Sequence, residues 1–171
     1  MKGAAIMQTI DLYDVPGNVF DRIGRQWMLI TARKGGRVNA MTASWGGLGE
    51  MWNRRAAFVF VRPQRYTYEF METADTFSLC FLKDSHKGAH KIMGSQSGRD
   101  LDKNAAAGLT VLDHGGYPYF AESELVLCCE KLYRGDLRED DFVDKGLVAQ
   151  HYPGKDFHRM YIGGVCLALR P

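Results

Sequence analysis

The chain has 171 residues, of which 46% are hydrophobic and 25% are charged, and its net charge is +2. This length is enough for a buried core, so we expect a single domain over residues 1–171. The small net charge gives no indication of nucleic-acid binding. No apolar run approaches the roughly 20 residues of a membrane helix, and residues 1–14 lack the apolar stretch of a signal peptide. We therefore expect a cytoplasmic protein with no nucleic-acid or membrane partner.

The cysteines and histidines give no indication of a metal site. The chain has four cysteines and no C-x-x-C pair, and the spacing of a zinc site is missing. Cys80 and Cys166 lie in apolar runs, where we expect buried free thiols, and the adjacent Cys128–Cys129 would need a strained backbone to form a disulfide. His86 and His90 have metal-ligand spacing but no third ligand nearby, so we expect a solvated pair.

The first half of the chain predicts paired strands. Trp27–Arg33 predicts a strand, and Lys34–Arg37 predicts a hairpin turn because its two glycines supply positive φ angles. Val38–Ser44 would return antiparallel to the first strand. Ala56–Val61 and Thr76–Leu82 predict two further strands from their apolar patterns.

The connections are predicted to be helical. We expect short helices over Tyr66–Thr73 and His86–Met93. Ser97–Asp100 has the S-x-x-D form of a capping box, which predicts a helix through about Ala107 that stops at Gly108.

Late strands complete the predicted fold. Leu125–Leu132 and Met160–Leu169 predict strands, and Gly163–Gly164 in the second indicates a bulge or a close backbone approach. Roughly six strands with short helices between them favour a mainly β fold, a closed antiparallel Greek-key barrel with helical insertions. A parallel doubly wound sheet is disfavoured, because no G-x-G-x-x-G turn follows a strand.

The segment Asn39–Gly47 is the first candidate binding segment. It begins as a strand and ends in small polar residues and paired glycines, which leave backbone N–H groups open to a ligand. Thr42 and Ser44 add hydroxyl groups, so the segment can lie against a flat hydrogen-bonding ring such as a flavin. The alternative is an ordinary tight barrel corner with Trp45 and Trp52 in the core.

The segment Arg62–Thr67 is the second candidate. Arg62 or Arg65 can hold an anion, such as the phosphate of flavin mononucleotide (FMN), through a charge-assisted hydrogen bond. Thr67 and the first N–H groups of the following helix would complete such a site, and Pro63 is compatible with a helix start. The alternative is a solvated loop whose arginines face water.

Two further features could take part in binding. Gly94–Lys103 carries Ser95 and Ser97 ahead of the predicted helix, with Arg99 and Lys103 four residues apart on one expected helix face. A capped surface helix explains this segment equally well, and it does not match a Walker loop.

His158 is the other feature, and it precedes the last predicted strand. At a barrel mouth it could donate a hydrogen bond to a bound ring or titrate near pH 7, whereas the alternative is a surface histidine. No Ser-His-Asp or Cys-His arrangement and no acid/base pair stands out.

In their order along the chain, these segments resemble the flavin reductase-like family of FMN-binding split barrels, and within it the flavoredoxin branch. One departure is Arg54-Arg55, where relatives often carry a proline after the Trp-Asn pair, and it leaves the shape of that loop open. The matching pieces cover most of the chain and are Asn18–Ala32, Asn39–Asn53, Val61–Phe70, Gly94–Lys103 and Tyr152–Val165.

The resemblance implies an FMN-dependent oxidoreductase. It would accept electrons from NAD(P)H on noncovalently bound FMN and pass them to a downstream acceptor. The lack of an acid/base pair agrees with this, because the cofactor does the redox chemistry. The alternatives are a non-catalytic electron carrier of the flavoredoxin kind, reduced by a protein partner, and a flavin-binding protein without redox turnover. The resemblance also implies a homodimer with FMN near the subunit interface.

The resemblance also assigns residues to the site. It places the flavin against the end of the Asn39–Trp45 strand and its phosphate side near Arg62–Thr67. His158 becomes the catalytic candidate, with a role in admitting nicotinamide or in supplying a proton. The predicted cofactor-binding residues are Asn39, Met41, Thr42, Ala43, Ser44, Trp45, Arg62, Pro63, Gln64, Tyr66, Thr67, Ser95, Ser97, Arg99 and Lys103, and no metal ligand is predicted.

Overall fold

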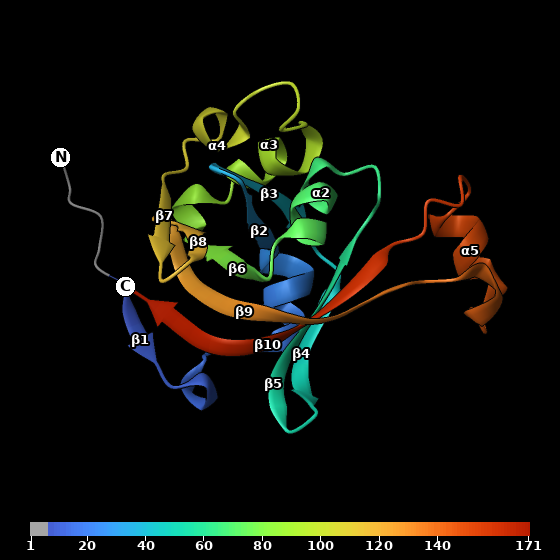
Figure 1. Ribbon diagram of the computed structural model, residues 1–171, viewed down its shortest axis with the longest axis horizontal. Helices are drawn as coiled ribbons and strands as arrows, with labels where there is room; N and C mark the ends of the chain where they lie inside the picture. Colours follow the sequence, from blue (N-terminus) through green and yellow to red (C-terminus); the bar gives the residue numbers. More distant parts are fainter. Residues whose placement is uncertain (1–6) are drawn as a thin grey trace.

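The computed structural model describes residues 7–171, and antiparallel strands dominate it (Figure 1). The strands are β1 (Gln8–Ile10), β2 (Met28–Lys34), β3 (Arg37–Ala43), β4 (Gly46–Met51), β5 (Arg54–Val61), β6 (Thr76–Leu82), β7 (Val111–His114), β8 (Tyr117–Phe120), β9 (Ser123–Asp136) and β10 (Arg159–Arg170).

The helices are short and lie in the connections between strands. The α-helices are α1 (Val19–Asp21), α2 (Tyr66–Thr73), α3 (Ala89–Ser95), α4 (Lys103–Ala106) and α5 (Lys145–His151). Single turns of other helical types are η1 (Leu12–Asp14), η2 (Arg22–Gln26), η3 (Asp84–His86) and η4 (Glu139–Asp141). No helix within residues 7–171 is both long and apolar enough to span a membrane.

The two edge strands of the main sheet are consecutive in the chain. Its strand order is β3-β2-β6-β9-β10-β5-β4, with β1 added beside β10, and β7 and β8 form a separate hairpin. β3 and β4 are therefore at opposite ends of the order, yet only Ser44 and Trp45 separate them in the chain. The mainly β antiparallel barrel expected from the sequence is confirmed, and Ser44–Trp45 bridges its two edges.

Local turn chemistry explains the hairpins. The predicted turn after β2 is confirmed, with Gly35 at a φ of 57°. Trp52 and Asn53 have φ angles of 53° and 56° and form a two-residue turn between β4 and β5. Two successive positive φ angles match the twist of a hairpin. Arg54 and Arg55, which stand where relatives often carry a proline, are the first residues of β5. The loop before them is therefore the tight turn at Trp52–Asn53.

The predicted irregularity in the last strand is confirmed at Gly163. The pairing of β10 with β9 shifts register between Ile162 and Gly163. A Cβ atom at Gly163 would lie 2.5 Å from the Phe77 ring and 2.9 Å from the Cβ of Cys129. Glycine is therefore required where β10 crosses the barrel core.

Some predicted elements are wrong in their bounds. The segment Ser97–Asp100 is a turn, and the helix behind it is only α4, capped by Asp102. The Ser97 hydroxyl accepts the Arg99 N–H at 3.2 Å, a local bond that competes with helix formation. The helix expected from His86 begins instead at Ala89, after η3.

The prediction of about six strands is also wrong, because β1, β4, β7 and β8 were not expected. β4 contains three glycines, which have low strand propensity, and β7 and β8 are only four residues each. Cys80 is a buried free thiol as expected, whereas the expected burial of Cys166 is wrong because its side chain is exposed; Cys128 and Cys129 are buried and form no disulfide with each other.

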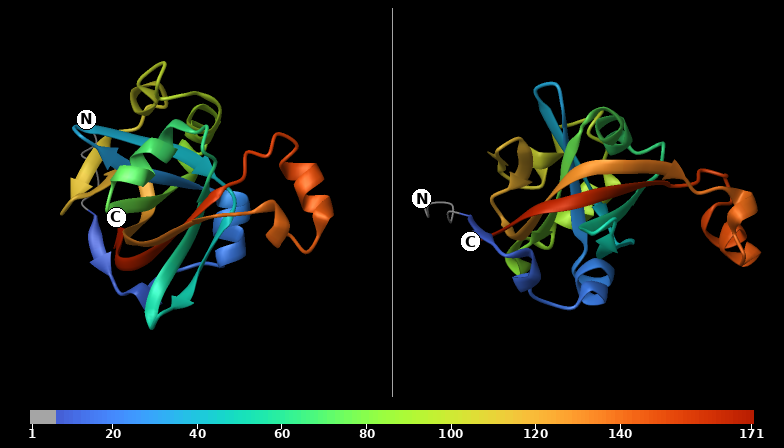
Figure 2. Two further views of the ribbon diagram at one scale, coloured as in Figure 1. Left: turned by 45° about the vertical axis from the view of Figure 1, so that its right-hand side comes forward. Right: turned by 60° about the horizontal axis from the view of Figure 1, so that its bottom comes forward.

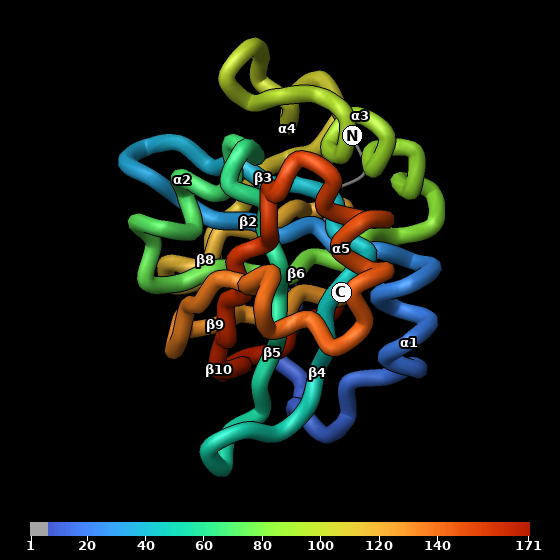
Figure 3. Tube along the Cα trace, turned by 90° about the vertical axis from the view of Figure 1, so that its right-hand side faces the viewer, coloured from blue at the N-terminus to red at the C-terminus, as the bar shows by residue number. Residues whose placement is uncertain are grey.

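A two-stranded arm leaves the barrel. β9 and β10 run together across the sheet and continue outward to carry η4 and α5, on the right of Figure 1 and in both views of Figure 2. Helices α2, α3 and α4 gather at another end of the barrel, as Figure 3 also shows. The strand ends between this helical end and the base of the arm carry the candidate site.

Candidate functional site

A cavity of about 240 Å³ opens where β3 passes into β4, and we call it the strand-end cavity. It brings together residues from the end of β3, the end of β5 and the start of β10, which the chain separates widely. Its lining residues are Met41, Thr42, Ala43, Ser44, Trp45, Phe60, Arg62, Arg65 and His158.

A second, more polar cavity of about 130 Å³ lies at the start of α2, and we call it the helix-start cavity. Arg65 lines both cavities, so the two are neighbours. The lining residues come from the turn before α2, its first turn, the end of α3 with the two residues after it, and the start of α4. They are Gln64, Arg65, Tyr66, Thr67, Ser95, Gln96, Ser97 and Lys103.

Two cations in the helix-start cavity, the half-buried Arg65 and the buried Lys103, have no carboxylate partner within residues 7–171. Arg65 donates to the carbonyl oxygens of Gly94 at 2.9 Å and Met93 at 3.4 Å, and Lys103 Nζ donates to the same Met93 oxygen at 3.0 Å. Burial lowers the pKa of Arg65. Burial and the charge of Arg65 lower the pKa of Lys103 to about 8. An anion in this cavity would relieve the unfavourable charge of both groups.

Thr67 is held from behind by Asn39. The Asn39 amide donates to the Thr67 hydroxyl oxygen at 2.8 Å, and both side chains are buried. A Cβ atom at Gly98 would overlap the Asn39 side chain, so glycine lets this loop close over it. Asn39 lines neither the strand-end nor the helix-start cavity, so its role is to orient the Thr67 hydroxyl.

Thr42 is fixed in the same manner by His90. The Thr42 hydroxyl donates to the His90 carbonyl oxygen at 3.0 Å and contacts Nδ1 of the His90 ring at 3.1 Å. His90 is buried, which corrects the expectation of a solvated pair with His86. Burial lowers the pKa of His90 to about 4. The contact joins the end of β3 to α3.

The aromatic wall of the strand-end cavity consists of Trp45, Phe60 and His158. The centroids of the Trp45 and His158 rings are 5.2 Å apart, and those of Phe60 and His158 are 6.5 Å apart. Trp45 is 44% exposed and Trp52 is 52% exposed, so the alternative that places both in the core is wrong. His158 is only 8% exposed, so the surface-histidine alternative is wrong as well.

The protonation of His158 bears on its predicted role. Burial and the charge of Arg62 lower the pKa of His158 to about 4, although Asp156 acts in the opposite direction. The ring is therefore neutral at pH 7. A neutral imidazole can donate or accept a hydrogen bond, but it does not hold the extra proton that a proton supply would require.

Arg62 and Arg65 differ in their partners. Arg62 forms an ion pair with Asp156, which Gln64 also contacts, and it donates to the carbonyl oxygen of His151 at 2.9 Å. These contacts fasten the inner end of the arm to β5. Of the two predicted anion ligands, Arg65 is the one without a carboxylate partner among the described residues.

Not every predicted residue faces a cavity. The Arg99 guanidinium pairs with Glu69 at 2.7 Å and lies over the Tyr66 ring, 4.9 Å from its centroid. Arg99 is outside α4, so it does not share a helix face with Lys103. Pro63 lies in the turn before α2 and lines neither cavity.

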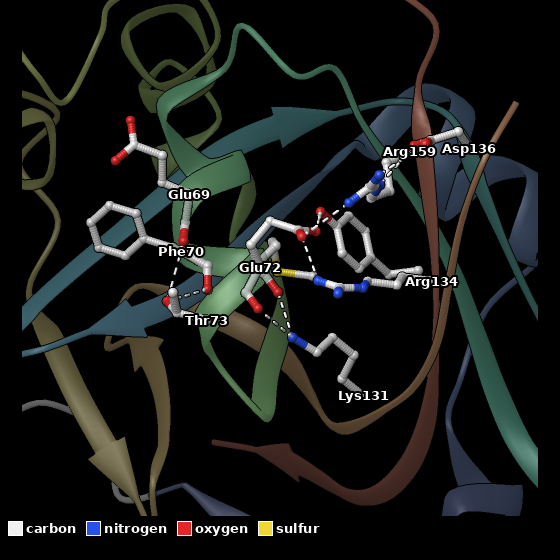
Figure 4. Close-up of polar contacts among 10 residues, drawn as sticks. Glu69, Phe70, Glu72, Thr73, Lys131, Arg134, Asp136 and Arg159 are labelled. Carbon is white, nitrogen blue, oxygen red and sulfur yellow. Dashed lines mark hydrogen bonds and ion pairs between the residues drawn. The ribbon is translucent and has the colours of Figure 1, made fainter.

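A second charged cluster fastens the other end of α2, and we call it the Glu72 cluster (Figure 4). Glu72 pairs with Arg134 and Arg159 at the base of the arm and accepts a hydrogen bond from the Tyr161 hydroxyl at 2.7 Å. Arg159 also pairs with Asp136 at 2.7 Å. Burial alone would raise the pKa of Glu72, but the bonds from Tyr161 and Arg159 outweigh it and lower that pKa.

The protein-family model described as flavin reductase like domain matches residues 20–166 of this chain. The chain belongs to the flavin reductase-like family. No curated protein matches it.

Solved structures of similar fold include other family proteins. An FMN-binding domain of a flavin reductases-like enzyme from Shewanella baltica is 19% identical, with a TM-score of 0.70, and the match covers 96% of this chain and 77% of that one. Flavoredoxin from Methanosarcina acetivorans is 20% identical, with a TM-score of 0.67 and coverage of 95% and 76%. The NADH:FAD oxidoreductase SgcE6 of Streptomyces globisporus is 14% identical, with a TM-score of 0.64 and coverage of 85% and 76%. The split-barrel fold of this flavin reductase-like chain is thereby confirmed.

The sequence missed several residues of this flavin reductase-like site. Phe60 lies in an apolar run that gave no reason to single it out, although strand alternation places it on one face with Arg62. His90 contacts Thr42 across 48 residues of sequence, and Tyr152 contacts His158 from the end of α5. Within residues 7–171, no group of three or more His, Cys, Asp or Glu side chains could hold a metal ion.

Proposed function

We propose that the strand-end cavity and the helix-start cavity together bind one FMN molecule. Its flat ring would occupy the first cavity and its phosphate the second. The observation that carries this proposal is a pair of cations, the half-buried Arg65 and the buried Lys103, which face a polar cavity without a carboxylate partner in the described chain. Buried charges are ordinarily paired, and a phosphate would supply the missing charge.

The residues present suit such a ligand. The first turn of α2 lines the helix-start cavity, and N–H groups at a helix start favour anions. Thr67, fixed by Asn39, can donate its hydroxyl hydrogen there. The small residues Ala43 and Ser44 let a flat ring approach the end of β3 closely.

We further propose that the protein is an oxidoreductase. Bound FMN supplies reversible two-electron redox chemistry. Trp45 is partly exposed at the mouth of the strand-end cavity, so a second flat molecule can approach beside it. We propose NAD(P)H as this molecule and as the electron donor, with a downstream acceptor of the electrons. The name of SgcE6, an NADH:FAD oxidoreductase of similar fold, agrees with such a donor.

The second candidate function is electron transfer without NAD(P)H turnover. It is favoured by the likeness in fold to a flavoredoxin. The protein would then take electrons from a reduced protein partner and pass them on.

One anaerobic experiment tests both candidates. The purified protein is loaded with FMN and mixed with NADH or NADPH while the flavin absorbance at about 450 nm is followed. Rapid bleaching is expected for the reductase, and bleaching only by a reduced protein donor would indicate the carrier. A protein that cannot be loaded with FMN would contradict both.

We also propose that the protein is a homodimer. The arm stands clear of the barrel (Figure 2), and it exposes the apolar side chains of Val143 and Leu147. A second copy of the chain would cover them. Sedimentation analysis is expected to give the mass of two chains for the parent protein and of one chain for Leu147→Asp; a monomeric parent protein would contradict the proposal.

A further inference from the structure

His158 lies where the arm meets the barrel, and its ring has two distinct sides. Its Nδ1 atom is 2.7 Å from the hydroxyl oxygen of Tyr152, at the end of α5. Trp45 and Phe60 pack on the ring from the barrel side. Because Nδ1 is occupied on the arm side, the ring edge that remains for the strand-end cavity carries Nε2.

The surroundings of Tyr152 decide the direction of this hydrogen bond. Tyr152 is buried, and its ring stacks on Phe157 at 4.8 Å and packs against Phe142 at 5.7 Å. The guanidinium of Arg62 lies 5.0 Å from the ring centroid and can donate but not accept. His158 is thus the acceptor that the structure offers to the Tyr152 hydroxyl within residues 7–171. A buried hydroxyl hydrogen without an acceptor would cost stability, so the phenol donates to Nδ1.

A neutral imidazole carries one hydrogen, on one of its two nitrogens. If Nδ1 accepts from Tyr152, that hydrogen is on Nε2. The neutral state is supported by the charges near the ring, where Arg62 from β5 disfavours protonation more than Asp156 favours it, and by burial.

We propose that Tyr152 is a positioning residue that holds His158 in its Nε2–H tautomer and so directs a fixed hydrogen-bond donor into the strand-end cavity. The donor suits a carbonyl or anionic oxygen of a molecule bound beside Trp45. This use of the donor rests on the proposed function, but the tautomer itself does not require a bound flavin.

The arm explains how this arrangement is maintained. The Arg62–Asp156 ion pair and the bond from Arg62 to the His151 carbonyl oxygen fix the end of α5 against β5. Phe142 and Phe157 then hold the Tyr152 ring. The arm therefore sets the tautomer of a residue in the cavity from outside the cavity.

The test is a two-bond ¹H–¹⁵N correlation spectrum of the full chain with labelled histidine, recorded at pH 7 without FMN. The signals of His158 are assigned by their loss in His158→Gln. We expect Nε2 to carry the hydrogen in the parent protein. Tyr152→Phe retains the aromatic packing and removes the hydroxyl, so the shifts of the two ring nitrogens are expected to move toward each other as the tautomers mix.

Tyr133→Phe is the matched control, because Tyr133 is an exposed tyrosine in the part of β9 that pairs within the main sheet. It is expected to leave the His158 signals unchanged. An Nδ1–H tautomer in the parent protein, or an unchanged pattern in Tyr152→Phe, would overturn the proposal; if Tyr152→Phe does not fold, the parent spectrum decides alone. A second spectrum after addition of FMN separates the two proposals, since failure to bind FMN contradicts the proposed function and leaves the tautomer result intact.

Discussion

The two ends of α2 carry charge in opposite ways. At the C-terminal end, the Glu72 cluster matches acidic with basic groups, and its contacts with Asp136 and Glu72 raise the pKa of Arg159. At the N-terminal end, the half-buried Arg65 and the buried Lys103 bond only to carbonyl oxygens within residues 7–171, and the pKa of each is lowered. Matched charges fasten α2 to the arm, whereas the unmatched cations indicate a place for an anion. Substitutions at each end of α2 separate these two roles.

The largest expected effect is on FMN affinity in Arg65→Gln. A hydrogen bond to a charged group contributes about 1.5–3 kcal/mol, so the dissociation constant should rise roughly tenfold to a hundredfold. Riboflavin lacks the phosphate, so its affinity should change much less. Fluorescence titration of both flavins measures the difference, and Arg62→Gln is the matched comparison because its guanidinium is paired with Asp156. An equal loss for both flavins in Arg65→Gln would place the phosphate elsewhere.

The next effect is on stability in Glu72→Gln. Gln keeps one acceptor oxygen but replaces the other with an NH2 donor and removes the negative charge that Arg134, Arg159 and the Tyr161 hydroxyl share. We expect the free energy of unfolding to fall by about 2 kcal/mol, because hydrogen bonds to a charged group are lost. Urea denaturation measures this change. The free energy of unfolding of Arg65→Gln should be no lower than that of the parent protein. A larger loss of stability in Arg65→Gln than in Glu72→Gln would contradict the assignment of the structural role to the C-terminal end of α2.

A smaller effect is the pH dependence of FMN binding above pH 8. The pKa of Lys103 is about 8 without an anion and would be raised by a bound phosphate. Above pH 8 the free protein loses this proton and binding must restore it, so FMN affinity should fall as the pH rises from 8 to 9.5. Riboflavin has the same flavin ring, so riboflavin titrations from pH 8 to 9.5 control for ionisation of that ring. In Lys103→Gln, the fall in FMN affinity above pH 8 that riboflavin does not share should disappear. If this pH dependence persists in Lys103→Gln, another group causes it.

The smallest effect is on acid stability. His90 and His158 have pKa values of about 4 in the folded protein, below the value of about 6.5 in an unfolded chain. The unfolded state therefore binds more protons between pH 6.5 and 4, so the free energy of unfolding should decrease as the pH falls through this range. His158→Gln should reduce the decrease in melting temperature between pH 7 and 5. If the melting temperature of His158→Gln falls between pH 7 and 5 as much as that of the parent protein, His158 is already charged in the folded protein.

Local patterns were enough to predict much of the fold. β6 and α2 were predicted with their observed bounds, and β2, β3 and the turn between them nearly so, because apolar periodicity and paired glycines act within a few residues. β4 could not be predicted in this way, since its glycines give no strand signal and its pairing with β5 sustains it.

The candidate site shows where the sequence was insufficient. Arg62 and Arg65 are equivalent in a six-residue segment, and the contact that distinguishes them comes from Asp156, 94 residues after Arg62. Ser97 and Arg99 likewise match the pattern of a helix start in the sequence. In the fold, the Ser97 hydroxyl accepts a hydrogen bond within a turn and Arg99 pairs with Glu69. Residue types were predicted from local sequence, whereas their partners depend on the folded chain.

A crystal structure of the protein with FMN tests the central claim most directly. We expect the phosphate between Arg65 and Lys103 in the helix-start cavity, and the ring in the strand-end cavity beside Trp45. A phosphate bound at Arg62, with Arg65 and Lys103 left without an anion, would contradict this assignment of the two cavities.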